Sequence, residues 1–585
     1  MLPNLRRPVQ GRRATRLPLA FIFRAFGAVR LANAKPLAQH LPMGPWMHTQ
    51  QSLKRTDLIL VFLTATIPRM IGACLLPNAF GDAYAYTEQI YYLRRAILNG
   101  SFSLSSLFGF WLPLYQLICA AISAIAGSPF YVPKLVSAFC GGGVCVLVLL
   151  LTWQLTLSRS FSWAAAVIVA VNPYHILYSA SAMTDVPHTF FILLCAYCCI
   201  RNRFVAAAFC ALAAGLIRIE SWVLIPIIPL AYLLTQSNLS TIHKRVHAVF
   251  STTLLALVLC AGPVFWLIVT WRATGTLWKY FEIRNNYIVE TLASSPSLAH
   301  LSLSRVGLDA VSLVYTSNPI ILYFSGLVLL LLVKGDAFCL SKPAIIRRLR
   351  QLLTKPQGCV LTFFFTHLIF LLMAYVTRNQ PEIWPRYGLI SFTLGLPLLA
   401  YGLTLNQPFT APHSSRNLRL LYLTGGFMVL QFCVQLIDVT RIVVKPDTNL
   451  IAAQFLEDQR RLDEATTIYC EDGAIRVLSG IPLEEFKDQY NSPADENAFI
   501  ESLRKNQVKL LVYKDLPGSR LKEIIAKISG QQKRTGITLE KIVPLPRNQV
   551  GGDTIVYRVH EGEVAEVTNR FTPAKRNQRL DSKTK

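Results

Sequence analysis

Acidic and basic side chains lie at the ends of several long apolar runs of this chain. Asp82 follows the first run, in PNAFGDAYAYTEQIYY, and Asp185 lies in NPYHILYSASAMTDVPHTF. Arg218 and Glu220 share LIRIESW, and Arg386 lies in RNQPEIWPRYGLI. Ionisable groups in or beside a membrane are costly, so each marks a candidate functional site. A carboxylate can deprotonate or orient an acceptor and Arg can neutralise a phosphate leaving group, so this set would suit transfer from a lipid phosphate.

Each of these residues also has a purely structural interpretation. Asp82 or Asp185 could cap the N-terminus of a helix, and Arg386 could extend its head group to the membrane interface. Arg218 and Glu220 are two residues apart and do not share a helix face, so we do not expect them to neutralise each other within a helix. Their structural interpretation is pairing with other loops.

Glu88 lies on the same predicted helix as Asp82 and has two interpretations as well. It could contact substrate, or it could pair with Arg95 or Tyr92 on the surface of that helix. The sequence leaves both open.

Two histidines flank Asp185 and invite a metal site. His175 and His188 stand on either side of it, but packed or hydrogen-bonded histidines are commoner than metal ligands. We therefore assign no metal ligand, and Asp185 and His188 are the candidates if a divalent metal takes part.

The composition indicates a membrane protein with many spans. The chain has 585 residues, 53% of them hydrophobic and only 15% charged, and its mean hydropathy is +0.40. Apolar runs of about 20 residues recur, which is the length needed to cross a bilayer. The formal net charge of +26 does not indicate nucleic-acid binding, because many Lys and Arg residues lie in short connections between apolar runs, as positive-inside bias predicts.

The thirteen cysteines do not indicate a disulfide framework. Most lie inside apolar runs, and the C-terminal region holds only Cys470. Small apolar residues packed between helices are the better interpretation.

We predict about eleven spans and a mainly α fold, a polytopic bundle of membrane helices. The predicted spans are 57–76, 133–153, 161–178, 185–200, 203–217, 220–236, 247–271, 310–333, 357–377, 384–405 and 417–438. The basic connection 334–355 should face the cytoplasm. The basic N-terminus and the other basic connections can also face the cytoplasm only if the apolar segment 110–127 does not cross the membrane. We therefore interpret this segment as a re-entrant or surface helix. Residues 77–131 then form one large outer loop whose first helix lies flat at the interface.

The two ends of the chain differ from this membrane module of residues 57–440. Residues 441–562 alternate short β-like and helical runs and predict an external α/β domain, followed by a basic, disordered tail over 563–585. Residues 1–56 form a basic extension without an acid, read as a transit segment or as an over-long start before Met47, with the second favoured.

The order of these features resembles the GT-C superfamily of polyprenyl-phosphate-dependent glycosyltransferases, which includes protein O-mannosyltransferases, aminoarabinose transferases and oligosaccharyltransferases. The matching pieces are GDAYAY with Asp82, the WLPLY stretch from Trp111, NPYHILYSASAMTD with Asp185, RIE at 218–220 and PRY at 385–387. The resemblance covers roughly residues 57–400. Two departures leave the subfamily open: Ala83 follows Asp82, and Asp185 stands where many relatives have Glu.

The resemblance implies an enzyme that transfers a sugar from a dolichyl or undecaprenyl phosphate donor to a lipid, glycan or protein acceptor on the outer face. It implies that Asp82 is the catalytic acid or base and that Asp185 assists it or holds a metal. Arg386 would hold the lipid phosphate, with Arg218 as a further candidate. The other implied substrate-binding residues are Tyr387, Glu220, Glu88 and Trp111.

A multi-pass protein of the bacterial inner membrane, with its C-terminal domain in the periplasm, fits this resemblance. The alternative is a transporter or flippase for a lipid-linked or anionic substrate. A transporter would be expected to show internal repeats and broken helices with polar centres, and we find no repeat in the chain. GDAYAY and the GGG at 141–143 lack the Lys-Ser/Thr of a phosphate loop, so close helix packing is the better explanation of those glycines.

Overall fold

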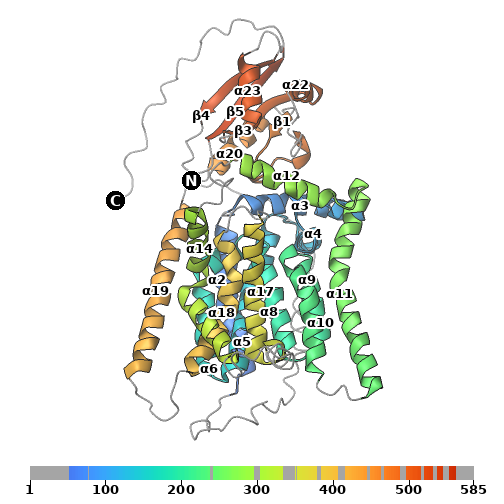
Figure 1. Ribbon diagram of the computed structural model, residues 1–585. Helices are drawn as coiled ribbons and strands as arrows, with labels where there is room; N and C mark the ends of the chain where they lie inside the picture. The colour runs from blue at the N-terminus through green and yellow to red at the C-terminus, as the bar shows by residue number, and fades with distance from the viewer. Residues whose placement is uncertain are drawn as a thin grey trace, which may run out of the picture. The chain divides into compact units, whose positions relative to one another are not determined.

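The protein is described by a computed structural model (Figure 1). The residues that it describes are 52–76, 78, 80–236, 241–294, 303–333, 350, 352–377, 384–405, 415–444, 448–462, 467–487, 496–515, 520–530, 537–544 and 553–561. The predicted tail 563–585, nearly all of the N-terminal extension, most of the basic connection 334–355 and Glu382 beside the PRY stretch lie outside the described residues.

Long apolar helices make up most of the described chain. Within it, six helices are long and apolar enough to cross a membrane, or seven if one bent pair counts as a single span. They are α2 (Arg55–Leu75), α5 (Tyr131–Thr156), α11 (Ile242–Thr274), α17 (Pro356–Val376), Pro385–Leu405, which joins η5 (Pro385–Tyr387) to α18 (Gly388–Leu405), and Tyr422–Val443 within α19 (Ser415–Val444); the bent pair is α6 (Arg159–Val171) with α7 (Pro173–Ser179). The protein is therefore an integral membrane protein.

Shorter helices occupy most of the other predicted spans. These are α8 (Asp185–Ile200), α9 (Phe204–Gly215), η3 (Ile219–Val223) with α10 (Leu224–Thr235), α14 (Leu303–Ser317) and α15 (Pro319–Val333). A further short helix, α4 (Leu114–Ala126), lies in the segment 110–127 that was predicted as a re-entrant or surface helix. The predicted count of about eleven is therefore not confirmed by helix length alone. Proline explains two of the breaks: it cannot continue the helix before it, and it begins α7 after Asn172 and α15 after Asn318.

Helix α5 forms the centre of the bundle and packs on α2, α6, α8 and α18. Three consecutive glycines allow the close approach. A Cβ atom at Gly142 would lie 1.9 Å from Thr66 Oγ1, and one at Gly141 would lie 2.5 Å from Ser179 Oγ. The interpretation of these glycines as helix-packing residues is confirmed.

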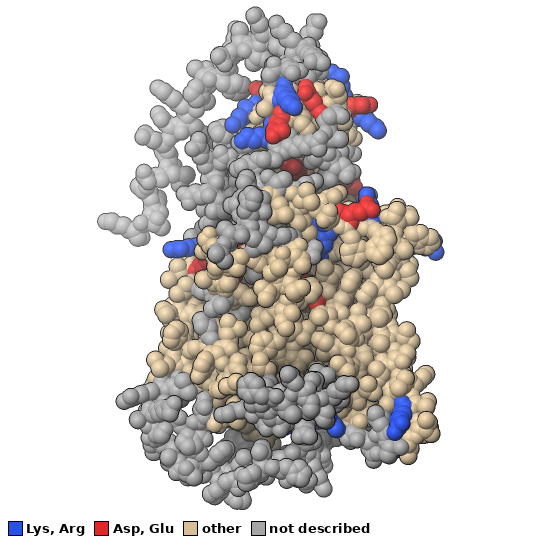
Figure 2. Space-filling view, in the orientation of Figure 1, with Lys and Arg blue, Asp and Glu red and all other residues tan. Residues whose placement is uncertain are grey.

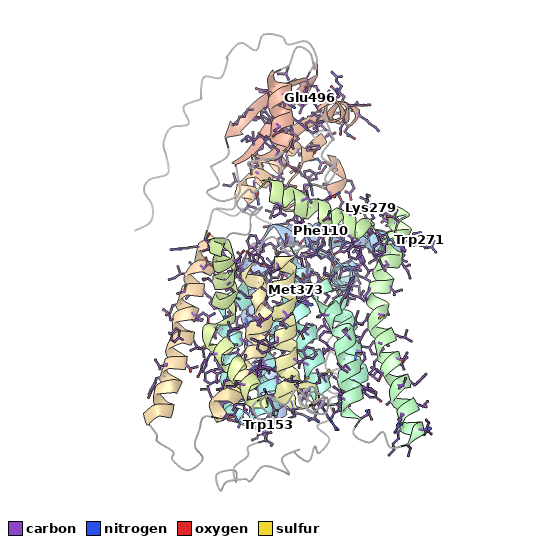
Figure 3. The ribbon with its side chains drawn as sticks, viewed as in Figure 1. Phe110, Trp153, Trp271, Lys279, Met373 and Glu496 are labelled. Atoms are coloured by element: carbon purple, nitrogen blue, oxygen red, sulfur yellow. The ribbon has the colours of Figure 1, made fainter. Side chains whose placement is uncertain are left out.

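Charged and aromatic side chains mark the two ends of the bundle. Figure 2 shows a broad band of uncharged surface with Lys, Arg, Asp and Glu gathered beyond it. Trp153 lies at one end and Phe110 and Trp271 at the other (Figure 3), as expected for aromatic residues at membrane interfaces. Helices α3 (Gly81–Leu98) and α12 (Lys279–Ser294) run across the second end, which we call the site end (Figure 1).

The C-terminal part is a five-stranded α/β module, as the sequence predicts. Its sheet has the order β2-β1-β3-β5-β4, in which β1 pairs in parallel with β2 and β3, and β5 pairs antiparallel with β3 and β4. The strands are β1 (Thr467–Cys470), β2 (Phe486–Lys487), β3 (Val508–Asp515), β4 (Ile537–Pro544) and β5 (Asp553–Glu561), and the helices are α20 (Thr448–Leu462), α21 (Gly473–Leu478), α22 (Glu496–Lys505) and α23 (Arg520–Gly530). Of the predicted β-like runs, VKLLVYKD coincides with β3 and DTIVYRV lies in β5. The run TTIYCEDGAIRVLSGI contains β1 but continues into helix α21, so its second half is a wrong prediction, and β2 and β4 were not predicted.

Candidate active site

Five charged side chains from separate parts of the sequence meet at the site end in two linked clusters. Arg386 Nη1 donates to Asp82 Oδ2 at 2.6 Å. Arg218 Nη1 donates to Asp185 Oδ1 at 3.0 Å, and its Nε and Nη2 donate to Glu220 Oε1 at 3.1 and 2.7 Å. These five of the sequence-predicted charged residues therefore lie together.

The ring of Tyr387 connects the two clusters. Its centroid lies 5.4 Å from the guanidinium carbon of Arg218 and 5.3 Å from that of Arg386. Both distances are within the range of a cation–π contact. Tyr387 therefore contacts both arginines and lies between the two clusters.

Neither aspartate caps its helix through its side chain. The N-cap of α3 is Phe80 and that of α8 is Thr184, so Asp82 and Asp185 lie within the first turn of each helix. The exposed N–H groups of a first turn stabilise a negative charge. The N-cap interpretation of both residues is wrong, and their carboxylates are available for the ion pairs.

Arg218 pairs with Asp185 from another part of the chain, as the structural interpretation expects, and it also pairs with Glu220 outside a helix. The backbone of Arg218 is extended, with φ −146° and ψ 139°, because the residue precedes the short helix η3. The restriction on pairs two residues apart holds only within a helix. The side chain of Arg218, extended before the short helix, can therefore reach the carboxylate of Glu220 two residues later.

The two aspartates of the site differ in their exposure. The side chain of Asp185 is 4% exposed, whereas that of Asp82 is 39% exposed. Within the described part of the chain, Asp185 Oδ2 and Arg386 Nε are buried and have no hydrogen-bond partner. Asp82 is therefore the carboxylate that a molecule from outside reaches most easily.

Trp111 lies beside the site through Tyr86, which stands one turn after Asp82 on α3. The Tyr86 and Trp111 rings are 4.5 Å apart, and the Tyr86 hydroxyl lies 3.1 Å from Thr184 Oγ1. Burial raises the pKa of Tyr86, so its hydroxyl stays neutral and acts as a hydrogen-bonding group. Tyr86 joins the first turn of α3 to the start of α8, and the sequence analysis did not single it out.

A pocket opens beside the charged network. It is lined by Asp185, His188, Thr189, Arg218, Glu220, His367, Arg386, Tyr387 and Ile390. A second pocket shares four of these residues and adds apolar ones, among them Ile192, Leu224 and Phe363. The lining thus changes from charged to apolar.

His367 in this lining was missed from the sequence, although a histidine inside an apolar span was the signal. Its Nε2 lies 2.9 Å from the Tyr387 carbonyl oxygen. His188 Nε2 lies 2.6 Å from Ser221 Oγ. In the part of the chain that the structure describes, no three His, Cys, Asp or Glu side chains are arranged to hold a metal ion.

Helix α12 was also not predicted from the sequence. Tyr280 on this helix is buried, its ring packs edge-on against Trp266 at 5.3 Å, and its hydroxyl interacts with Arg284. Alternating apolar and charged residues in KYFEIRNNYIVETLAS could have indicated this interfacial helix.

Glu88 does not line either pocket and lies outside the network. It is 1% exposed and accepts a hydrogen bond from Arg476 Nη2 of the α/β module at 2.7 Å. Arg95, one of its two expected partners, pairs with Glu484 instead.

No protein-family model matches this chain, and no curated protein matches it. Among solved structures, it is similar to the archaeal oligosaccharyltransferase AglB from Archaeoglobus fulgidus, in complex with an inhibitory peptide and a dolichol-phosphate, at 10% identity and a TM-score of 0.45 over 78% of this chain and 69% of that one. It is also similar to ArnT from Cupriavidus metallidurans bound to undecaprenyl phosphate, at 14% identity and a TM-score of 0.48 over 86% of this chain and 98% of that one. The apo state of ArnT gives 13% identity and a TM-score of 0.46 over the same shares. The chemistry of the site therefore has to follow from its own residues.

Proposed function

We propose that this protein is a membrane glycosyltransferase that moves a sugar from a polyprenyl phosphate carrier to an acceptor at the site end. One observation carries the proposal: Arg386 holds the most exposed acid of the site at 2.6 Å and lines a charged pocket that shares four residues with a more apolar one. A donor of this class has a phosphate joined to an apolar chain. The two kinds of lining suit those two parts.

The reaction would break one bond at the sugar and form one. An acceptor hydroxyl attacks the anomeric carbon, the bond from that carbon to the phosphate oxygen breaks, and its electron pair leaves with the polyprenyl phosphate. The proton of the hydroxyl goes to the Asp82 carboxylate, which acts as general base. By the resemblance, the configuration at the anomeric carbon inverts.

Arg386 would neutralise the phosphate, whose negative charge increases as the bond to the sugar breaks. A guanidinium forms paired hydrogen bonds with phosphate oxygens. Asp82 occupies Arg386 Nη1, while Arg386 Nε has no partner among the described residues. A phosphate arriving at Arg386 would compete with Asp82 and release its carboxylate for the acceptor.

Arg218 would serve the site by holding its acids rather than by binding phosphate. Its Nε, Nη1 and Nη2 groups all donate to Asp185 or Glu220. The buried Asp185 would then be held with its second oxygen towards the acceptor or a metal ion. Trp111, whose ring packs at a tilt against Tyr86, would flank the sugar.

The proposal includes a place for the reaction. We propose that the site end faces the periplasm of a bacterial inner membrane, so that the acceptor arrives from the aqueous side. The sugar, the length of the carrier and the acceptor class stay open.

The experiment is a transfer assay with purified protein in lipid nanodiscs. A panel of polyprenyl phosphate sugars is supplied with membrane extract as acceptor, and released polyprenyl phosphate is measured. We expect one donor to be consumed by the wild type and not by Arg386→Ala, while Glu457→Gln, which changes an exposed acid of α20, keeps the wild-type rate. Donors that bind to the protein and are never consumed, or an Arg386→Ala variant as fast as wild type, would contradict the proposal.

A further inference from the structure

Helix α3 has two opposite faces that contact two different parts of the chain. Asp82 and Tyr86, one turn apart, face the charged network and Thr184. Glu88, Tyr91 and Arg95 follow at intervals of three and four residues and share another face. All three contact the α/β module: Glu88 pairs with Arg476, and Tyr91 and Arg95 contact Glu484.

The contact through Glu88 is a completely buried ion pair. Both side chains are 1% exposed, and their atoms are 2.7 Å apart. The same guanidinium donates through Nη1 to the carbonyl oxygen of Cys470, the last residue of β1, at 2.6 Å. Two buried charges are costly unless they are paired and hydrogen-bonded, so the arrangement favours one geometry strongly.

The place of this contact in the sheet is also informative. Strand β1 lies between β2 and β3 and is parallel to both, so the strand order reverses beside the carboxyl end of β1. Open α/β sheets take their ligands at such a position. Glu88 reaches this position: a Cβ atom at Gly473, the first residue of α21 after β1, would lie 3.3 Å from Glu88 Oε2.

We propose that the α/β module is a positioning module for the catalytic helix: Arg476, at the carboxyl end of β1, binds Glu88 and thereby sets the position of Asp82 on the same helix. Glu88 and Asp82 are six residues apart, which is about 9 Å along a helix axis. A rotation of α3 that broke the pair with Arg476 would move Asp82 relative to Arg386. This inference rests on the proposed function only for its effect on rate.

The test is a four-member cycle in the full-length protein: wild type, Glu88→Gln, Arg476→Met and the double variant. Hydrogen exchange of residues 81–98 reports the position of α3 without any assay of activity. We expect faster exchange in both single variants and a fall in kcat of about 100-fold in Arg476→Met, since a misplacement of about 1 Å can cost that much. Donor affinity should not fall, because Arg386 lies outside α3.

The double variant decides whether the two residues act together. If they do, the second substitution lowers kcat little further once the first is made, so the two fold-losses in kcat do not multiply. Should Arg476→Met fail to fold, Arg476→Lys keeps the charge without the fork that reaches both Glu88 and Cys470, and we expect a smaller change in the same direction. Arg461→Glu, at an exposed ion pair of α20, is the matched control.

Two results would overturn the inference: unchanged exchange of α3 in a folded Arg476 variant, or losses that multiply in the double variant. A different result would count against the proposed function alone. If exchange changes as expected while no variant, wild type included, transfers sugar, the docking of α3 stands and the glycosyltransferase proposal fails.

Discussion

The substitution Asp82→Asn separates the rate of the reaction from the affinity for the donor. Asparagine keeps the shape of the side chain, and its amide oxygen can still accept the hydrogen bond from Arg386 Nη1. It cannot take a proton from the acceptor. Because a general base contributes about 10²- to 10⁴-fold, we expect kcat to fall by that factor.

The affinity for the donor should change in the opposite direction. A hydrogen bond to a charged group is worth about 1.5–3 kcal/mol. The carboxylate of Asp82 is 39% exposed, so solvent reduces this to about 1 kcal/mol. A phosphate that competes with Asp82 for Arg386 would therefore bind about fivefold more tightly to Asp82→Asn.

Two measurements on the same preparation check this prediction. Single-turnover transfer gives the rate, and binding of polyprenyl phosphate followed by tryptophan fluorescence gives the affinity. Glu457→Gln on α20 is the control, since it removes an exposed carboxylate. Weaker donor binding in Asp82→Asn, or a rate within tenfold of wild type, would refute the role of Asp82 as a base held by Arg386.

Two further predictions concern the phosphate ligand and the packing of the bundle. Arg386→Lys keeps the charge but loses the planar fork, so we expect the Kd for polyprenyl phosphate to rise about tenfold, as measured by the same fluorescence titration; an unchanged Kd would place the phosphate elsewhere. Gly142→Val puts side-chain atoms where a Cβ alone would lie 1.9 Å from Thr66 Oγ1, so we expect a loss of about 1–3 kcal/mol in stability, seen as a lower Tm in detergent, whereas Gly425→Val, with no atom within 4 Å of its Cβ, should melt like wild type.

The sequence predicts the helices well because lipid imposes a simple requirement on each of them. A segment in the bilayer has to satisfy its own backbone hydrogen bonds, so apolar length alone identifies it. The predicted span 57–76 corresponds to α2, and 357–377 corresponds to α17. The predicted span 161–178 is two helices in the structure, α6 and α7. The break falls at Pro173 because proline disfavours a helical conformation in the residue before it.

The charged residues of the site could be predicted one by one but not as pairs. Each stands out because charge is rare near apolar runs. Which residue pairs with which depends on the fold: Arg386 and Asp82 are 304 positions apart, and Arg476 and Glu88 are 388 apart. The pairing of Arg218 with Glu220 was missed for a local reason, since its extended backbone could not be read from the sequence.

The two faces of α3 and the pairing of Asp82 with Arg386 together imply an order of events. A carboxylate oxygen that already accepts a hydrogen bond from a guanidinium, as Asp82 Oδ2 does from Arg386 Nη1, is less available to an acceptor hydroxyl. In the proposed reaction the arriving phosphate would remove that pairing, so Asp82 would serve as a base only when the donor is in place. This order needs a helix that keeps its position while Asp82 changes partner, and the buried pair of Glu88 with Arg476 on the opposite face supplies that fixed position. An acceptor would therefore be deprotonated beside a bound donor and not in an empty site.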